Sequence, residues 1–221
     1  MGVRDGLAYL LSRALVKLTR GHATLIRYRF YAQPVPTHSL APARASSTRI
    51  GRLAPDDPLL KAMPRPPHVI ERRLRDGAHC FAASRDGVLQ GFIWICEREY
   101  LEDEVRCLYR WSPSSVAAWD FDVYVAPEAR GGRLFARLWD CANAWMREHG
   151  YAWSLSRIST FNIASRAAHE KLNIQCIGSA TFLVLGKLQV SFASSLKGPH
   201  IAFGARAYPT LVLTPPSMAD S

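Results

Sequence analysis

The residues best suited to bind an anionic ligand form a short turn. Gly131 and Gly132 are adjacent, and Arg130 and Arg133 flank them. Glycines let the backbone approach a ligand closely, and arginines add permanent positive charge. Residues 134–148 have helical periodicity, so the turn precedes a helix whose first N–H groups attract phosphate. We therefore predict a phosphate or pyrophosphate site here; an ordinary basic helix start is the alternative interpretation.

A second informative segment, residues 162–174, follows after one predicted strand and reads N-I-A-S-R-A-A-H-E-K-L-N-I. Together the two segments resemble the GNAT superfamily of coenzyme A-dependent N-acyltransferases. The residues that match the family's V-x-P-x-x-R block and its later helix are Val125, Pro127, Arg130, Asn162, Glu170, Lys171 and Leu172. By order of elements, the resemblance covers about residues 49–192.

The resemblance implies an α/β fold with a mixed sheet. It also implies a reaction in a ternary complex, in which an amine directly attacks the acyl thioester of acetyl-coenzyme A or another acyl-coenzyme A. The residues expected to bind the coenzyme are Val123, Val125, Arg130, Gly131, Gly132, Arg133, Leu134, Phe135, Ala136 and Asn162. Two of them depart from the family pattern, because Arg133 replaces a glycine and Phe135 a small residue. Asn162 is also a favoured helix N-cap.

The attacking amine must lose a proton, because an alkyl ammonium has a pKa of about 10. The resemblance places the acceptor beside the strand predicted over residues 119–125, so we predict Asp122 as the proton acceptor. Asp120 shares its face of the strand, and Glu97 and Glu99 are weaker candidates. The alternative is that both aspartates lie on a solvated face.

His169 stands where the family's helix carries a tyrosine that protonates the departing thiolate. It lies seven residues after Asn162, about two helical turns away and on nearly the same face. An imidazole, whose ordinary pKa is about 6.5, donates a proton when it is protonated or in the right neutral tautomer. We therefore predict that His169 is a general acid, with a surface or core histidine as the alternative.

The elements that must position these residues follow from periodicity and turn signals. Asp86-Gly87 separates two apolar-rich runs and predicts a hairpin, and Gly150 ends the helix that begins near Leu134. The expected elements are a helix over 3–20, a strand over 26–31, a linker over 34–48, a strand over 49–53, helical stretches near 60 and over 68–75, strands over 80–84 and 88–96, an irregular arm over 98–114, strands over 119–125 and 151–158, a helix over 162–172 and one or two strands within 177–192.

These elements predict a basic N-terminal segment over residues 1–48, an acyltransferase domain over 49–200 and a C-terminal extension over 201–221. We expect the extension to fray from Pro215 onward. The fold class is therefore mixed α/β, with an N-terminal amphipathic helix and strand added to the family's fold.

The first helix is amphipathic and basic. Its apolar arc consists of Val3, Leu7, Leu10, Leu11, Ala14, Leu15 and Leu18, with Arg13, Lys17 and Arg20 away from it. Residues 1–50 hold eight basic residues and one acid, so they carry +7 of the net charge of +10. Such a segment suits anionic lipid, nucleic acid or an acidic acyl carrier protein; docking on its own domain or a solvated basic face are the alternatives.

Composition excludes other classes of protein. A chain of 221 residues with 48% hydrophobic and 21% charged residues is not wholly disordered, and no apolar run reaches the ~18–20 residues of a membrane span. The five cysteines and seven histidines lack metal-binding spacings, so we expect no metal and a cytoplasmic protein, peripheral to the membrane at most. The aromatic residues that would line an acceptor pocket, or fill the core, are Trp94, Tyr109, Trp111, Trp119 and Trp153.

Three functions compete. The first is an N-acetyltransferase that acts on a small-molecule or peptide amine. The second is a long-chain acyltransferase that uses acyl carrier protein or acyl-coenzyme A at a membrane surface. The third is a non-catalytic module that binds coenzyme or nucleic acid. The pairing of the Arg130 turn with the Asn162 helix argues against the third, and we expect no specific nucleic-acid binding.

Overall fold

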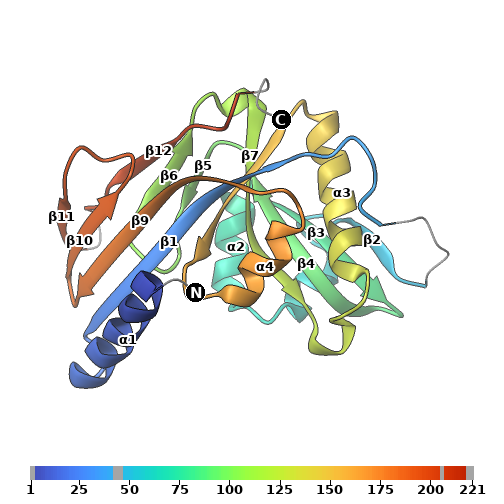
Figure 1. Ribbon diagram of the computed structural model, residues 1–221. Helices are drawn as coiled ribbons and strands as arrows, with labels where there is room; N and C mark the ends of the chain where they lie inside the picture. Colours follow the sequence, from blue (N-terminus) through green and yellow to red (C-terminus); the bar gives the residue numbers. More distant parts are fainter. Residues whose placement is uncertain (1–2, 42–46, 205–206, 218–221) are drawn as a thin grey trace. The chain divides into compact units, whose positions relative to one another are not determined.

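The computed structural model describes residues 3–41, 47–204 and 207–217, and the fold is mixed α/β, as predicted (Figure 1). The chain forms two compact units. We call residues 35–97 and 118–154 the central unit. Residues 1–34, 98–117 and 155–221 form the terminal unit, so the units cross the predicted boundaries at residues 48 and 200.

The central unit contains an antiparallel sheet with the strand order β7-β4-β3-β2. Its strands are β2 (Arg49–Arg52), β3 (His79–Arg85), β4 (Val88–Cys96) and β7 (Ala117–Val125). Its helices are η1 (Pro58–Ala62), α2 (Pro67–Arg75), η3 (Pro127–Ala129) and α3 (Leu134–Glu148). The hairpin prediction is confirmed, because Asp86 and Gly87 have φ values of 51° and 78° and join β3 to β4.

Helix α3 follows the predicted bounds and ends before Gly150, whose φ is 79°. One face of the helix is apolar and packs on β2, β3 and β4. The buried residues of this face include Leu138, Trp139, Ala142, Trp145 and Met146. Because this face is held by the sheet, the start of α3 is fixed in relation to the end of β7.

The terminal unit contains two sheets. The larger sheet has the order β11-β10-β9-β1-β8, with most of β8 in this unit, and the smaller sheet has the order β12-β6-β5. The larger sheet consists of β1 (Ala23–Pro34), β8 (Trp153–Ser159), β9 (Gln175–Leu185), β10 (Leu188–Ala193) and β11 (His200–Phe203). The smaller sheet consists of β5 (Glu99–Leu101), β6 (Leu108–Trp111) and β12 (Thr210–Leu213). The helices are α1 (Val3–Leu18), η2 (Ser114–Val116) and α4 (Ile163–Glu170).

The C-terminal extension contains more structure than the sequence predicts. It includes nearly all of β11, which pairs with β10, and β12, which pairs in parallel with β6. A parallel pairing with a distant strand leaves no local signal, which is why the pattern did not reveal β12. The predicted fraying falls partly on residues 218–221, and the predicted linker partly on residues 42–46; both ranges lie outside the described residues.

The five candidate pocket aromatics are core residues of their units, because each has at most 3% of its surface exposed. Helix α1 lies along the start of β1 (Figure 1), where the Ser12 hydroxyl donates to the Leu25 carbonyl at 2.9 Å. Among the described residues, no helix combines the length and the apolar character needed to cross a membrane.

Candidate active site

The glycine-rich turn of the central unit joins β7 to α3, as the sequence predicts (Figure 1). Gly131 has a φ of 78°, a conformation that favours glycine. Arg133 precedes the helix and makes no side-chain cap hydrogen bond. The N–H groups in the first turn of a helix have no carbonyl partner within it, and residues 130–133 are exposed. The turn therefore offers uncapped donors to an anion, as a pyrophosphate requires.

The side chains around the turn add charge without filling it. Arg133 is exposed, and Arg130 folds back so that its Nε donates to the Val125 carbonyl at 3.1 Å. The Phe135 ring contacts the Trp139 ring edge-on, with 6.3 Å between the centroids. Because these two residues are one helical turn apart, the phenylalanine at the family's small-residue position packs along α3.

A bulge interrupts β7 just before the turn. Between the pairs Phe92–Tyr124 and Trp94–Phe121, β7 has one residue more than β4. Asp122 lies in this extra step with a φ of 50°, which is unusual for a residue other than glycine. A bulge redirects the backbone and side chains of its strand, so the direction of β7 at Val123 depends on Asp122. No feature of the sequence predicted this bulge.

Gly91 supports the end of β7 and was missed by the sequence analysis. It lies opposite Val125 on β4. A Cβ atom at this position would lie 2.7 Å from the Tyr124 carbonyl oxygen and 3.1 Å from Leu138. Only glycine therefore lets β4 approach both β7 and α3 here. The available signal was a single glycine inside an otherwise apolar strand.

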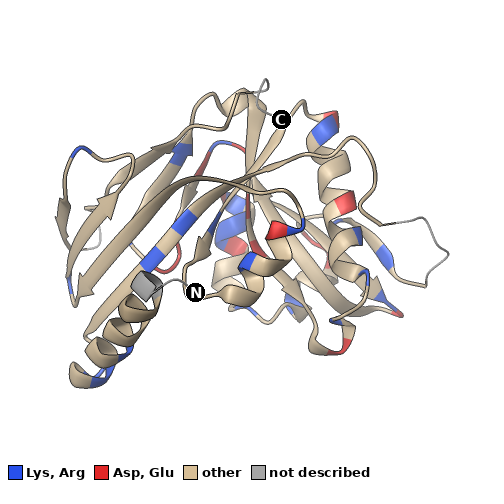
Figure 2. Ribbon diagram, viewed as in Figure 1, with Lys and Arg blue, Asp and Glu red and all other residues tan. Residues whose placement is uncertain are grey.

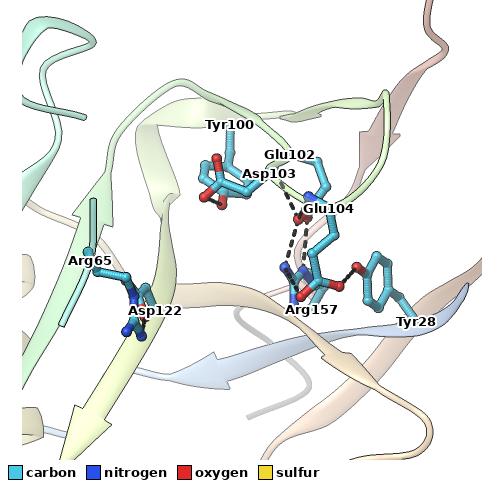
Figure 3. Close-up of polar contacts among 8 residues, drawn as sticks. All are labelled: Tyr28, Arg65, Tyr100, Glu102, Asp103, Glu104, Asp122 and Arg157. Carbon is cyan, nitrogen blue, oxygen red and sulfur yellow. Dashed lines mark hydrogen bonds and ion pairs between the residues drawn. The ribbon is translucent and has the colours of Figure 1, made fainter. Parts of the chain in front are cut away.

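Asp122 is held by two arginines of the central unit. Arg65 donates from Nε at 2.8 Å and from Nη2, and Arg73 donates from Nη1 (Figure 3 shows Arg65 and Asp122). The Arg73 and Asp122 side chains are only 7% and 12% exposed. Burial raises the pKa of Asp122, but the arginine hydrogen bonds outweigh it and hold the pKa below its ordinary value. The carboxylate is therefore a weak proton acceptor, and the geometry favours a role in fixing the bulge.

The other candidate carboxylates also have partners. Buried Asp120 accepts from the Ser154 hydroxyl at 2.6 Å. Half-exposed Glu97 accepts from His79 Nε2 at 2.6 Å and from the Tyr151 hydroxyl at 2.8 Å. Burial raises the pKa of Glu97, and these two hydrogen bonds outweigh that effect and lower it.

Glu99 belongs to the terminal unit, where it forms an exposed ion pair with Arg110 at 2.8 Å. An exposed pair of this kind is screened by water and contributes little energy.

The second predicted segment forms α4 of the terminal unit. Asn162 is its N-cap, as its residue type favours, because its side chain accepts from the Ser165 N–H at 3.0 Å. His169 is 6% exposed, and its Nδ1 lies 2.8 Å from the Ser165 carbonyl oxygen. A carbonyl only accepts, so Nδ1 carries the proton of this hydrogen bond. His169 Nε2 is then an acceptor in the neutral ring and a donor only in the imidazolium.

The structure thus gathers most predicted site residues on one strand-turn-helix of the central unit. These are Asp122, Val123, Val125, Arg130, Gly131, Gly132, Arg133, Leu134, Phe135 and Ala136. Asn162 and His169 share α4 in the terminal unit. The described part of the chain contains no group of three or more His, Cys, Asp or Glu side chains placed to hold a metal ion.

Comparisons with known proteins give a family match and a shared fold. The model of the acetyltransferase (GNAT) family matches residues 50–174. A tandem GNAT protein from the clavulanic acid biosynthesis pathway, solved without acetyl-coenzyme A, superposes with a TM-score of 0.51 and 14% identity, over 81% of this chain and 58% of that chain. A functionally unknown conserved protein from Staphylococcus epidermidis gives a TM-score of 0.50 and 11% identity, over 77% of this chain and 66% of that chain.

At such low identity, these two structures show a shared fold only. The present chain spans between 58% and 66% of their lengths. Comparison with curated protein sequences gives no match.

Proposed function

This chain belongs to the acetyltransferase (GNAT) family, and we propose that it transfers an acetyl or other acyl group from coenzyme A to an amine of a small molecule or peptide. The family match covers more than half of the chain and includes β7, the glycine turn, α3 and α4. The observation that carries the proposal is the uncapped start of α3 behind the Gly131 turn. This geometry supplies N–H donors and positive charge where a pyrophosphate would bind.

The predicted coenzyme-binding residues have different roles in this proposal. Backbone N–H groups from Gly131 to Ala136 hold the pyrophosphate, and the guanidinium groups of Arg130 and Arg133 neutralise its charge. The β7 backbone from Val123 to Val125 would bind the acyl-bearing arm of the coenzyme. Bound coenzyme supplies the acyl thioester, which the deprotonated amine attacks.

Two further residues have proposed roles, Asp122 in positioning β7 and His169 in proton transfer. Asp122, through Arg65 and Arg73, fixes the bulge that sets the direction of β7; its predicted role as proton acceptor stays the alternative. His169 protonates the departing thiolate from Nε2, and its hydrogen bond to Ser165 orients the ring for this. The amide bond forms as the carbon–sulfur bond breaks, the thiolate takes the His169 proton, and the proton that the nitrogen loses passes to solvent, so no further reactant is required.

A pair of glycine variants tests the proposed coenzyme site. Gly131 and Gly77 have the same φ of 78°, and an added Cβ meets nothing within 4 Å at either position. Gly131→Asp and Gly77→Asp therefore introduce the same backbone strain and the same charge in one unit. Only the change at Gly131 places a carboxylate against the pyrophosphate, and we expect coenzyme A affinity to fall at least about tenfold by calorimetry.

Gly131→Asn separates charge from strain, because asparagine tolerates the same conformation without the charge. It should retain more affinity than Gly131→Asp, and Gly77→Asp should bind coenzyme A like the unchanged protein. Equal affinities for all four proteins, each folded to the same degree, would remove the turn from the proposal.

A further inference from the structure

Exposed apolar side chains and positive charge gather in the terminal unit. Among the described residues, every large hydrophobic side chain that is exposed belongs to this unit, except Val88. The segments of the terminal unit contain 15 Lys and Arg against 7 Asp and Glu, so they carry +8 of the net charge of +10. Figure 2 shows basic residues along α1 and β1. Such a combination of apolar surface and charge requires an explanation.

The larger sheet of this unit has one buried face and one open face. On the buried face, Phe30, Phe182 and Ala202 are at most 1% exposed. The opposite face is also apolar, because the paired residues Leu25, Leu183, Val190 and Ile201 form one row across β1, β9, β10 and β11. Its outer part is uncovered in the described structure: Ile201 and Phe203 are 68% and 72% exposed.

Helix α1 presents a second apolar surface. It docks on β1 through its Ser12 side, so the apolar arc predicted from the sequence is largely exposed. Leu10 and Leu18 are 64% and 82% exposed, and Leu7 and Leu11 are also more than half exposed. Arg13 and Lys17 are exposed beside this arc. At 100° per residue, Lys17 lies at the edge of the arc, about 20° from Leu10 in direction and about two turns further along the helix.

We propose that the terminal unit binds the surface of anionic membranes, with the apolar arc of α1 inserted among the lipids. An interfacial helix buries its apolar face at the boundary of the acyl chains, and basic residues at its side contact anionic headgroups. Each basic residue near a charged leaflet contributes about 1 kcal/mol. The open face of the larger sheet adds apolar surface to the same unit.

The charges on α1 favour an anionic membrane over a second copy of the chain as its binding partner. An isologous dimer formed through the arc of α1 would place Arg13 and Lys17 of both copies beside one interface. Like charges placed together at an interface are unfavourable. Anionic lipid instead complements the basic residues beside the leucines. The observations therefore favour lipid over self-association.

Vesicle co-sedimentation of the full-length protein tests the proposal. The unchanged protein should partition to vesicles that contain phosphatidylserine, and hardly to pure phosphatidylcholine. Arg13→Ala with Lys17→Ala removes two charges and should lower partitioning about 10- to 30-fold at low salt. Leu11→Gln with Leu18→Gln should lower it to a similar degree, because glutamine retains helix propensity but removes the apolar surface.

The matched control is Arg49→Ala with Arg52→Ala, which removes two exposed charges from β2 of the central unit. This control should partition like the unchanged protein. Circular dichroism must show the same helix content in all variants. Equal partitioning of the α1 variants and the control would overturn the proposal. A dimer in sedimentation velocity that the leucine variant abolishes would also overturn it, because the arc would then bind a second copy.

Discussion

Each unit contains a carboxylate that is held by arginine and largely shielded from water, and the two carboxylates support different structures (Figure 3). In the terminal unit, Arg157 on β8 donates to Glu102 from Nε at 2.9 Å and from Nη2 at 2.6 Å. In the central unit, Asp122 occupies a strained position in a bulged strand that leads to the glycine turn. The Glu102–Arg157 pair connects the segment over residues 98–114 to strand β8. Asp122 and its two arginines hold the bulged strand β7 beside the proposed coenzyme site.

The surroundings of the two carboxylates differ as well. The Glu102 side chain is fully buried, and the Arg157 guanidinium also lies over the Tyr28 ring, 4.5 Å from its centroid. Burial lowers the pKa of Arg157, but the Glu102 hydrogen bond outweighs it and raises the pKa. Asp122 instead shares its charge with Arg65, whose side chain is 30% exposed. We infer that Glu102 stabilises the terminal unit, whereas Asp122 also holds the strand that leads to the proposed coenzyme site.

The largest effect is expected from Arg157→Ala. This change leaves the fully buried Glu102 carboxylate without its guanidinium, and removing one partner of a buried ion pair costs about 3–5 kcal/mol. Urea denaturation should show this loss in the free energy of unfolding. Arg110→Ala is the control, because its pair with Glu99 is exposed and should contribute less than about 1 kcal/mol. Similar losses in both variants would contradict the contrast between these pairs.

Asp122→Asn should have the next largest effect. The amide still accepts a hydrogen bond but leaves two guanidinium groups without a counter-charge, which should lower stability by about 2–3 kcal/mol near neutral pH. Because folding lowers the pKa of Asp122, its contribution is present above the unfolded pKa of about 3.9 and is lost as pH falls through the folded value. The asparagine variant should lack this part of the acid sensitivity.

Kinetics of the same variant separate the two roles of Asp122. If the residue fixes the bulge, Asp122→Asn should weaken coenzyme affinity as well as turnover, because β7 shifts. If turnover is lost while stability and coenzyme affinity are unchanged, Asp122 is the proton acceptor that the sequence predicted.

His169→Ala should have the smallest effect, a fall in turnover of about 10²-fold with little change in coenzyme affinity. His169→Tyr should restore activity, because a tyrosine hydroxyl can also donate the proton. His149→Ala is the control, because His149 Nδ1 also lies 2.8 Å from the carbonyl four residues before it. Full activity and an unchanged pH profile in His169→Ala would exclude the general-acid role.

Local signals predicted the parts of the fold that local structure determines. The helix over residues 134–148 and the Asp86-Gly87 hairpin were both predicted, because a terminating glycine and a two-residue turn act on their immediate neighbours. The N-cap of α4 at Asn162 was available from residue type for the same reason.

Long-range contacts explain what the sequence did not reveal. Arg65 and Arg73 are 57 and 49 residues from Asp122, so nothing near the aspartate indicated its partners or the bulge. The apolar arc of α1 was visible in the pattern, but periodicity does not say which face docks. The helix contacts β1 through Ser12, a polar residue outside that arc.

The decisive measurement for the proposed function is the release of free coenzyme A thiol from acetyl-coenzyme A, with and without added primary amines. We predict amine-dependent release by the unchanged protein and by Gly77→Asp, and strongly reduced release by Gly131→Asp. A panel of acyl donors from acetyl to palmitoyl, read by mass spectrometry of the acylated amine, also defines the preferred chain length. If no donor gives amine-dependent release while coenzyme A still binds, or if Gly131→Asp releases thiol at the unchanged rate, the proposed function is wrong.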